Sequence, residues 1–249
     1  MCGIVGAIAD RDVSGILLEG LKRLEYRGYD SAGIALIDGE TSQINFTKTV
    51  GKVNQLVKAA TSNKSRGCLG IAHTRWATHG KPTVANAHPH TSNNDIAIVH
   101  NGIIENFESL KSQLIKSGYK FKTQTDSETI AHLIHKARKG GKVSLLDAVK
   151  QVIRKLHGAY GICVMDRTSP KEIIAARSGS PLVVGLGIGE NFVASDPLAL
   201  GQVTDRFIYL EEGDIARVTL DSVEVWSGSK RVKRKQATVR NRAADSEKG

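Results

Sequence analysis

The sequence predicts an α+β fold built around two mainly antiparallel sheets. Three observations predict it. An apolar run starts at the second residue, the helical patterns are grouped instead of alternating strictly with strands, and residues 158–226 form short strands separated by Gly, Pro and Asp turns. Turns of this kind join antiparallel neighbours, and grouped helices are typical of α+β domains rather than of doubly wound parallel sheets. A chain of 249 residues is long enough to bury a sizeable core.

The first half of the chain is expected to contain strands, two helices and one long loop. Asp12 is expected to cap a helix that ends near Arg27-Gly28, because apolar residues recur there every three to four positions. The predicted strands are residues 3–9, 31–38, 43–49 and 68–73, and a second helix is predicted within residues 51–61. Residues 74–94 are rich in His, Thr, Asn and Pro without any period, so they predict a long loop of the kind that is often functional.

The second half is expected to contain three helices and the remaining strands. Asn106 is expected to cap a helix that stops at Gly118, and Thr125 to Glu128 match a capping box before the next helix. Gly140-Gly141 ends that helix, and the third follows. The predicted strands are residues 95–100, 160–165, 172–176, 182–186, 192–195, 207–210, 215–218 and 223–226.

Composition excludes several classes of protein. Hydrophobic residues make up 40% of the chain and charged residues 24%, as in ordinary globular proteins. No apolar run approaches the ~18 residues that a membrane helix needs, and charges at residues 10–12 interrupt the first apolar run too early for a signal peptide. Cys2, Cys68 and Cys163 match no zinc or disulfide framework, so the expected location is the reducing cytoplasm.

The net charge of +10 is concentrated at the C-terminal end. From residue 229 onward the chain has eight basic residues and two acidic ones, a net +6, and apolar residues become rare. We therefore expect residues 227–249 to be a basic linker or a disordered tail that follows a domain of residues 1–226.

The N-terminus carries a candidate nucleophile. Once Met1 is removed, the thiol and the free α-amine belong to the same residue, Cys2. The reference pKa of an α-amine is about 7.7–8.0, so this amine can serve as the base that activates the thiol. The alternative is a hydrophobic first strand in which the second residue happens to be Cys.

Four short segments of the chain are distinctive in combination. They are residues 2–6 (Cys-Gly-Ile-Val-Gly), 24–33 (Leu-Glu-Tyr-Arg-Gly-Tyr-Asp-Ser-Ala-Gly), 73–80 (His-Thr-Arg-Trp-Ala-Thr-His-Gly) and 100–106 (His-Asn-Gly-Ile-Ile-Glu-Asn). Together they resemble the glutamine-hydrolysing domain of the N-terminal-nucleophile amidotransferases, in the form found in the glucosamine-6-phosphate synthases. Residues 185–196 fit the same family. The resemblance covers residues 2 to about 226, and the combination is specific although each segment alone is weak.

The resemblance implies a four-layer αββα sandwich, the fold of N-terminal-nucleophile hydrolases. It also implies L-glutamine as substrate and no cofactor. The synthases continue into a sugar isomerase domain that is larger than this one, whereas this chain stops at Gly249. We therefore expect the glutamine half-reaction alone, with the isomerase domain as a partner in the full-length synthase and a homo-oligomer as its assembly.

The implied reaction is acyl transfer from the glutamine side-chain amide to the Cys2 thiolate, followed by hydrolysis of the thioester to glutamate. The α-amine would take the thiol proton and pass it to the leaving ammonia. A retained Met1 would turn this amine into an amide without basicity, so that form is expected to be inactive.

Asn101-Gly102 follows a predicted strand and has two interpretations. One is an Asn-Gly hairpin turn, which is the strongest short turn signal. The other is an oxyanion hole made of the Asn101 side-chain amide and the Gly102 N–H, which the other segments favour.

The remaining candidate residues would bind the substrate. The resemblance implies that Arg75 and Thr78 hold the α-carboxylate under a lid that carries Trp76, with His79 in the same loop. It also implies that Asp126 binds the α-ammonium group, although an acidic residue in the first turn of a helix equally suits the helix dipole.

Arg27-Gly28 is either a helix end with its Gly cap or a segment beside the nucleophile. In the family the Gly28 carbonyl can orient the Cys2 amine, and Arg27 gives support. The eight histidines show no metal-ligand spacing, so we expect no metal site and assign the loop histidines no role.

Two other functions are compatible with the sequence. One is the glutaminase domain of another amidotransferase, such as the phosphoribosyl pyrophosphate enzyme that opens purine synthesis. The other is a non-enzymatic module that binds an acidic partner or nucleic acid through residues 230–235. That binding would depend steeply on salt and would be lost on trimming after Trp226.

Overall fold

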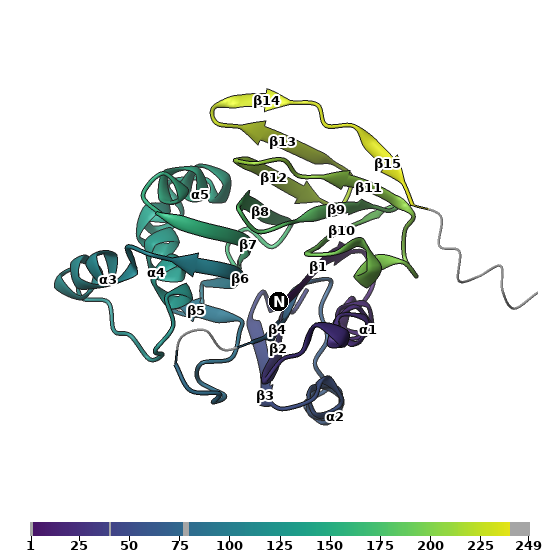
Figure 1. Cartoon of the computed structure of the whole chain (residues 1–249), viewed down its shortest axis with the longest axis horizontal. Helices are drawn as coiled ribbons and strands as arrows, with labels where there is room; N and C mark the ends of the chain where they lie inside the picture. The colour runs from purple at the N-terminus through teal and green to yellow at the C-terminus, as the bar shows by residue number, and fades with distance from the viewer. Residues whose placement is uncertain (1, 40, 77–79, 240–249) are drawn as a thin grey trace, which may run out of the picture.

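The computed structural model describes residues 2–39, 41–76 and 80–239. Two antiparallel sheets lie face to face, and helices cover the outer face of each, so the four-layer αββα architecture is confirmed. In Figure 1, helices α3, α4 and α5 lie on one side of the molecule and α1 and α2 on the other. No helix in the described part of the chain is both long and apolar enough to cross a membrane.

The first sheet has eight strands in the order β15-β11-β9-β10-β1-β4-β2-β3. Its strand β1 lies between β10 and β4 and is buried along its whole length. The bounds are β1 Gly3–Ala9, β2 Ser31–Ile37, β3 Ile44–Val50, β4 Leu69–Arg75, β9 Val183–Leu186, β10 Glu190–Ala194, β11 Arg206–Tyr209 and β15 Gln236–Thr238.

The second sheet has seven strands in the order β14-β13-β12-β8-β7-β6-β5. The bounds are β5 His90–Ser92, β6 Ile96–Ile104, β7 Gly158–Asp166, β8 Glu172–Ser178, β12 Asp214–Thr219, β13 Val223–Ser227 and β14 Lys230–Val232. The helices are α1 Ser14–Arg23, α2 Val53–Ser62, α3 Phe107–Lys116, α4 Ser127–Arg138 and α5 Leu145–Ile153, with 3₁₀ turns at Glu25–Arg27, Lys139–Gly141 and Pro197–Leu200.

Strand β1 shows how the sequence pattern builds the layers. Ile4 and Ile8 point into the core between the two sheets, whereas Val5 and Ala7 point into the core under α1 and α2. Successive side chains of a strand face opposite sides, so an uninterrupted apolar run suits a strand that is covered on both faces. The β1 backbone is therefore held rigidly in the middle of the molecule.

Three predicted helix caps are wrong in detail. Val13, not Asp12, is the N-cap of α1, and the Asp12 carboxylate accepts from the backbone N–H groups of Ser14 and Gly67. The side chain of Asn106 stands at the start of α3 but donates to the Lys155 carbonyl instead of capping the helix. Glu128 accepts from the backbone of the preceding loop, so the capping box does not form. The side chains of Asp12 and Asn106 bond to residues distant in sequence, and that of Glu128 bonds to the loop before the helix.

The expected irregular tail is corrected by the structure for residues 227–239. Strand β14 pairs with β13, and β15 pairs with β11 at the edge of the other sheet. The Arg234 guanidinium donates to Asp214 in two hydrogen bonds of 2.8 Å and neutralises this fully buried carboxylate. Some of the basic residues that indicated a solvated linker therefore form ion pairs with carboxylates of the folded domain. Residues 240–249 lie outside the described part of the chain.

Candidate active site

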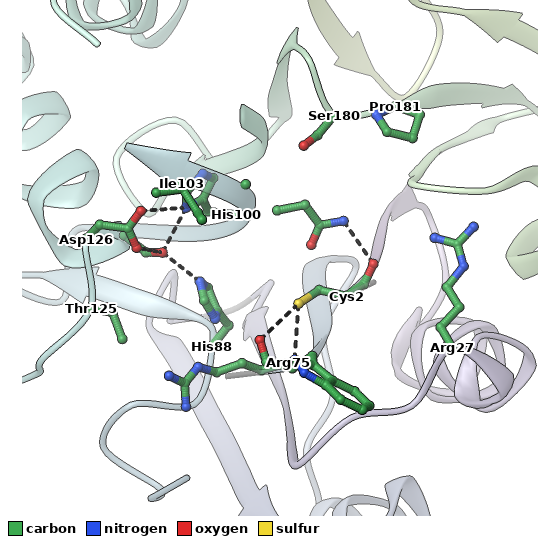
Figure 2. A pocket seen from close by; sticks show the side chains of 14 residues that line it. Cys2, Arg27, Arg75, His88, His100, Ile103, Thr125, Asp126, Ser180 and Pro181 are labelled. Carbon is green, nitrogen blue, oxygen red and sulfur yellow. Dashed lines mark hydrogen bonds and ion pairs between the residues drawn. The ribbon is translucent and has the colours of Figure 1, made fainter. Parts of the chain in front are cut away.

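A cavity of about 430 Å³ lies at the N-terminal end of β1, where the two sheets meet. Figure 2 shows Cys2 on one side of it and Asp126 on the other. The lining residues are Cys2, Arg27, Arg75, Trp76, His88, His100, Asn101, Gly102, Ile103, Thr125, Asp126, Ser127, Ser180 and Pro181. Seven predicted site residues, from five separate segments of the chain, therefore meet at one place.

Strand β1 positions Cys2 through its neighbours. The N–H of Gly3 donates to Thr74 Oγ1 at 3.0 Å, and the N–H of Ile4 donates to Ser195 Oγ at 3.0 Å. A Cβ at Gly3 would lie 2.7 Å from Thr74 Oγ1, so only glycine allows this approach. The Trp76 N–H donates to Cys2 Sγ at 3.1 Å and fixes the sulfur at the cavity wall.

The environment of the Cys2 thiol keeps it protonated. Burial raises its pKa above the ordinary value, and the Trp76 N–H and the nearby positive charge of Arg75 offset this only in part. A thiol of this kind needs a base to become a nucleophile near neutral pH. The arrangement therefore suits a reaction in which an adjacent amine removes the proton.

Asn101 and Gly102 lie inside strand β6, which continues to Ile104. They pair with Gly161 and Tyr160 of β7, so the hairpin-turn interpretation is wrong. Gly102 has φ +127°, and a Cβ there would lie 2.0 Å from the Ala159 carbonyl oxygen. Asn101 Nδ2 donates to the Cys2 carbonyl oxygen at 3.0 Å, which brings the amide beside Cys2.

Arg75 and Asp126 place opposite charges on the cavity wall. The Arg75 side chain is 4% exposed, and its guanidinium contacts the backbone carbonyls of Gly80 and Lys81 and lies 3.8 Å from Asp30. Asp126 stands at the N-cap of α4 but makes no cap hydrogen bond; its Oδ2 accepts from Ile104 N–H at 2.8 Å. A buried cation and a buried anion in one cavity can complement an α-carboxylate and an α-ammonium group.

Trp76 forms part of the cavity mouth and is 55% exposed. Its ring lies over Gly28, where a Cβ would be 2.3 Å from Trp76 Cζ3 and φ is +72°, so this position favours glycine on two grounds. Arg27 forms an ion pair with Asp196 and lines the cavity. The role of the Gly28 carbonyl stays a prediction, and Thr78 and His79 lie outside the described residues.

A cluster of buried histidines beside the cavity was missed by the sequence analysis. His73, His88, His90 and His100 are all at most 5% exposed, and the His73 and His88 ring centroids are 4.1 Å apart. His88 Nε2 and His100 Nδ1 both lie within 3.0 Å of Ser127 Oγ. No role was predicted for the loop histidines, whereas the structure buries His88 and His90 and gives both a hydrogen-bond partner. Within the described ranges, no group of three or more His, Cys, Asp or Glu side chains is arranged to hold a metal.

Acid is expected to destabilise the fold through this cluster. Burial lowers the pKa of His73 to about 3 and those of His88 and His90 well below the ordinary value. The unfolded chain binds protons below pH ~6.5 that the folded chain does not, so stability is complete above that pH and is lost as pH falls toward 3. The slope is about 1.4 kcal/mol per pH unit for each such histidine.

Urea unfolding at pH 7.5, 6.5 and 5.5 measures this effect. The free energy of unfolding should fall steeply between the last two values, and His90→Gln should reduce that slope. Substitution of the exposed His157 by Gln is the control and should leave the slope unchanged. A free energy that is constant from pH 7.5 to 5.5 would contradict the expected cost of protonating the cluster.

Three further groups of cavity-wall residues were not predicted from the sequence. Thr125 and Ser127 line the cavity but were assigned only to the start of a helix. Ser180 and Pro181 also line it but were assigned only to a turn. Ile103 carried a usable signal, since it is an apolar residue directly after Asn101-Gly102, and it is 40% exposed at the cavity.

Comparison with known proteins assigns a family. A family model described as a glutamine amidotransferase domain matches residues 73–202, which is just over half of the chain. The chain belongs to the glutamine amidotransferase domain family. The matched range of this amidotransferase domain includes Arg75, Asn101 and Asp126 of the cavity wall.

Curated relatives of the amidotransferase domain are longer than this chain. It is 58% identical over 226 residues to the glutamine–fructose-6-phosphate aminotransferase (isomerizing) of Pseudomonas putida, and 57% identical over 234 residues to the enzyme of that name from Acinetobacter baylyi. The alignments cover 91% and 94% of this chain. The chain spans 37% and 38% of the length of these relatives.

Solved structures share the fold of the amidotransferase domain. The glutamine phosphoribosylpyrophosphate amidotransferase from B. subtilis superposes with a TM-score of 0.77 at 29% identity, over 92% of this chain and 49% of that one. A glutamine aminotransferase class-II domain protein from Silicibacter pomeroyi, at 16% identity and a TM-score of 0.62, covers 91% of this chain and 99% of its own and resembles it in fold alone.

Proposed function

We propose that this chain hydrolyses L-glutamine to glutamate and ammonia through a thioester on Cys2. The observation that carries the proposal is the cavity that contains the Cys2 sulfur, the Asn101 amide and the opposite charges of Arg75 and Asp126. These groups match, in kind, the reacting amide and the two charged ends of a free amino acid.

The chemistry requires that Met1 be removed, and Met1 lies outside the described residues. The Cys2 α-amine then takes the thiol proton, and Sγ attacks the side-chain amide carbon of glutamine. The amine returns the proton to the nitrogen as the C–N bond breaks and ammonia leaves. Water, deprotonated by the same amine, hydrolyses the thioester to glutamate and restores the thiol.

Negative charge develops on the amide oxygen during both steps. We assign the donors for this oxygen to Asn101 Nδ2 and the Gly102 N–H, which lie at the cavity wall beside Cys2. Preorganised donors of this kind are worth roughly 3–4 kcal/mol each in the transition state.

The remaining roles concern binding of the substrate. Arg75, with Thr78, would hold the α-carboxylate, and Asp126 would hold the α-ammonium group. Trp76 and the segment through His79 would close over bound glutamine and delay the entry of water until ammonia has left.

Two further residues would support the nucleophile. The Gly28 carbonyl would orient the Cys2 amine. Arg27, fixed by its ion pair with Asp196, would support this segment without reacting.

The relatives support a proposal for the ammonia acceptor. We propose that the domain supplies ammonia for the synthesis of glucosamine-6-phosphate from fructose-6-phosphate, in the cytoplasm, as part of a longer homo-oligomeric synthase whose isomerase domain follows residues 227–249. Identities of 57–59% to aminotransferases of that name favour this over the purine-pathway enzyme, for which the identity is 29%. Dependence of the full-length protein on fructose-6-phosphate tests the assignment.

Binding of acidic partners through residues 230–235 is disfavoured by the ion pairs in that segment. Arg231 pairs with Glu224 at 2.8 Å, and Arg234 pairs with Glu211 and Asp214. These arginines are therefore already compensated by carboxylates of the fold.

Asp126→Asn tests substrate recognition. Loss of the carboxylate removes a charge-assisted hydrogen bond, worth about 1.5–3 kcal/mol, so we expect KM for glutamine to rise roughly 10- to 150-fold with a smaller change in kcat. The assay is release of glutamate and ammonia in equal amounts. Wild type should reject N-acetylglutamine, whereas the variant should discriminate far less between glutamine and N-acetylglutamine.

The control for this experiment is Asp221→Asn, at an exposed position outside the cavity. It should leave KM unchanged. An Asp126→Asn enzyme that keeps the wild-type KM and still rejects N-acetylglutamine would contradict the assigned role of Asp126. Absence of glutamate release from processed wild type would contradict the proposed function as a whole.

A further inference from the structure

His73 is a fully buried histidine of β4, in the first sheet, whose ring reaches across to β6 in the second sheet. Its Nε2 lies 3.1 Å from the His100 carbonyl oxygen and 2.9 Å from Asn101 Oδ1. The proposed reaction gives His73 no part. It nevertheless contacts the one side chain that is assigned to the oxyanion.

The hydrogen-bond partners determine the tautomer of His73. A backbone carbonyl oxygen only accepts, so Nε2 must carry the proton in order to bond to His100. The ring is neutral because burial lowers the pKa of His73 to about 3. Nδ1 therefore carries no proton, in agreement with its position, where it is buried and meets no hydrogen-bond partner in the described part of the chain.

The protonated Nε2 in turn determines the orientation of the Asn101 amide. An N–H cannot accept from an amide NH₂, so the atom of Asn101 that faces His73 must be Oδ1. The NH₂ group is then directed to the other side, where it donates to the Cys2 carbonyl oxygen at 3.0 Å. The two ends of an Asn side chain are nearly identical in shape, so hydrogen bonds alone choose between them.

We propose that His73 is a positioning residue that sets the Asn101 amide with its NH₂ toward the oxyanion and its Oδ1 away from it. The inference rests on the proposed function. In the opposite orientation an acceptor oxygen would face the negative charge that develops on the substrate, which would remove one donor and add repulsion. The His88 ring, whose centroid is 4.1 Å from that of His73 at an interplanar angle of 36°, packs against the His73 ring and holds it in place.

The test measures kcat and KM for glutamine in single and double variants. His73→Leu removes the donor and should lower kcat about 10- to 100-fold, because it impairs one oxyanion donor, with KM changed less than about twofold. His73→Gln keeps an amide N–H at similar reach and should recover most of the lost kcat. In the Asn101→Ala background, both His73 substitutions should lower kcat no further, since there is no amide left to orient.

His90→Leu is the matched control, because His90 is equally buried in the same cluster but contacts Thr125 instead of Asn101. Any loss of kcat that it causes should be the same with Asn101 and with Ala at position 101. The inference would be overturned if His73→Leu lowered kcat by the same factor with Asn101 and with Ala at position 101. It would also be overturned if His73→Gln lowered kcat as much as His73→Leu does. If His73→Leu does not fold, His73→Gln decides alone: kcat close to that of wild type supports the inference, and a fall of about tenfold or more that is the same with Asn101 and with Ala at position 101 overturns it.

Failure of the proposed function has a different result. Processed wild type would then release no ammonia from glutamine, and Asn101→Ala would have no rate to lower. If wild type is active and Asn101→Ala impairs it, but the effects of the His73 and Asn101 substitutions are additive, only the role of His73 is rejected.

Discussion

Replacement of Cys2 by Ala is expected to abolish release of ammonia from glutamine, with a loss of kcat on the order of 10⁶-fold, as is typical when the only nucleophile of a covalent mechanism is removed. The neighbouring groups, including the Asn101 amide, remain in place and cannot form the thioester. Cys2→Ser keeps the shape and the α-amine. It should nevertheless be severely impaired, because an alcohol is far harder to deprotonate than a thiol.

The control is Cys68→Ala, which removes a half-buried cysteine outside the cavity and should leave turnover unchanged. Thermal unfolding of both variants checks the fold. Residual turnover in Cys2→Ala within tenfold of wild type would show that another group carries the reaction.

Asn101→Ala is expected to give the second largest effect, a fall in kcat of about 10²- to 10³-fold with KM nearly unchanged. The reason is geometric: Asn101 Nδ2 lies beside Cys2, the proposed nucleophile, and a donor there would contribute only as charge appears on the substrate oxygen. Steady-state kinetics at saturating glutamine give kcat directly, and binding of glutamate reports the ground state.

Asn106→Ala is a matched control, since Asn106 lies just beyond the same strand but bonds to the backbone of Lys155 and His157. It should alter stability more than kcat. An Asn101→Ala enzyme that binds glutamate much more weakly but turns over at the wild-type rate would remove the oxyanion role.

Much of the fold was predictable because its signals are local. The apolar run at the N-terminus corresponds to β1, and the strands predicted at residues 31–38 and 43–49 correspond to β2 and β3. The seven strands predicted after residue 158 match observed strands within two residues at every end, whereas β14 and β15 were not predicted. Local patterns succeed in these places since each element buries the face that its own sequence makes apolar.

The errors occur where contacts distant in sequence decide. Asn101-Gly102 has strong turn propensity, but nine consecutive pairs between β6 and β7 keep it in a strand. Thr125 to Glu128 match a capping box, yet the backbone N–H groups of Lys122 and Thr123 donate to the Glu128 carboxylate. The buried histidines come from three strands, β4, β5 and β6, and from the loop before β5, and they meet only in the folded chain. No spacing in the sequence therefore reveals their cluster.

The central claim is that one unblocked residue, Cys2, supplies both the sulfur and the proton acceptor. The most direct measurement is the intact mass of the protein before and after exposure to a reactive diazo-ketone analogue of glutamine. We expect chains that lack Met1 to gain one adduct, on Cys2, and chains that retain Met1 or carry Cys2→Ala to gain none. Equal labelling of chains with and without Met1, or labelling that persists in Cys2→Ala, would contradict the claim.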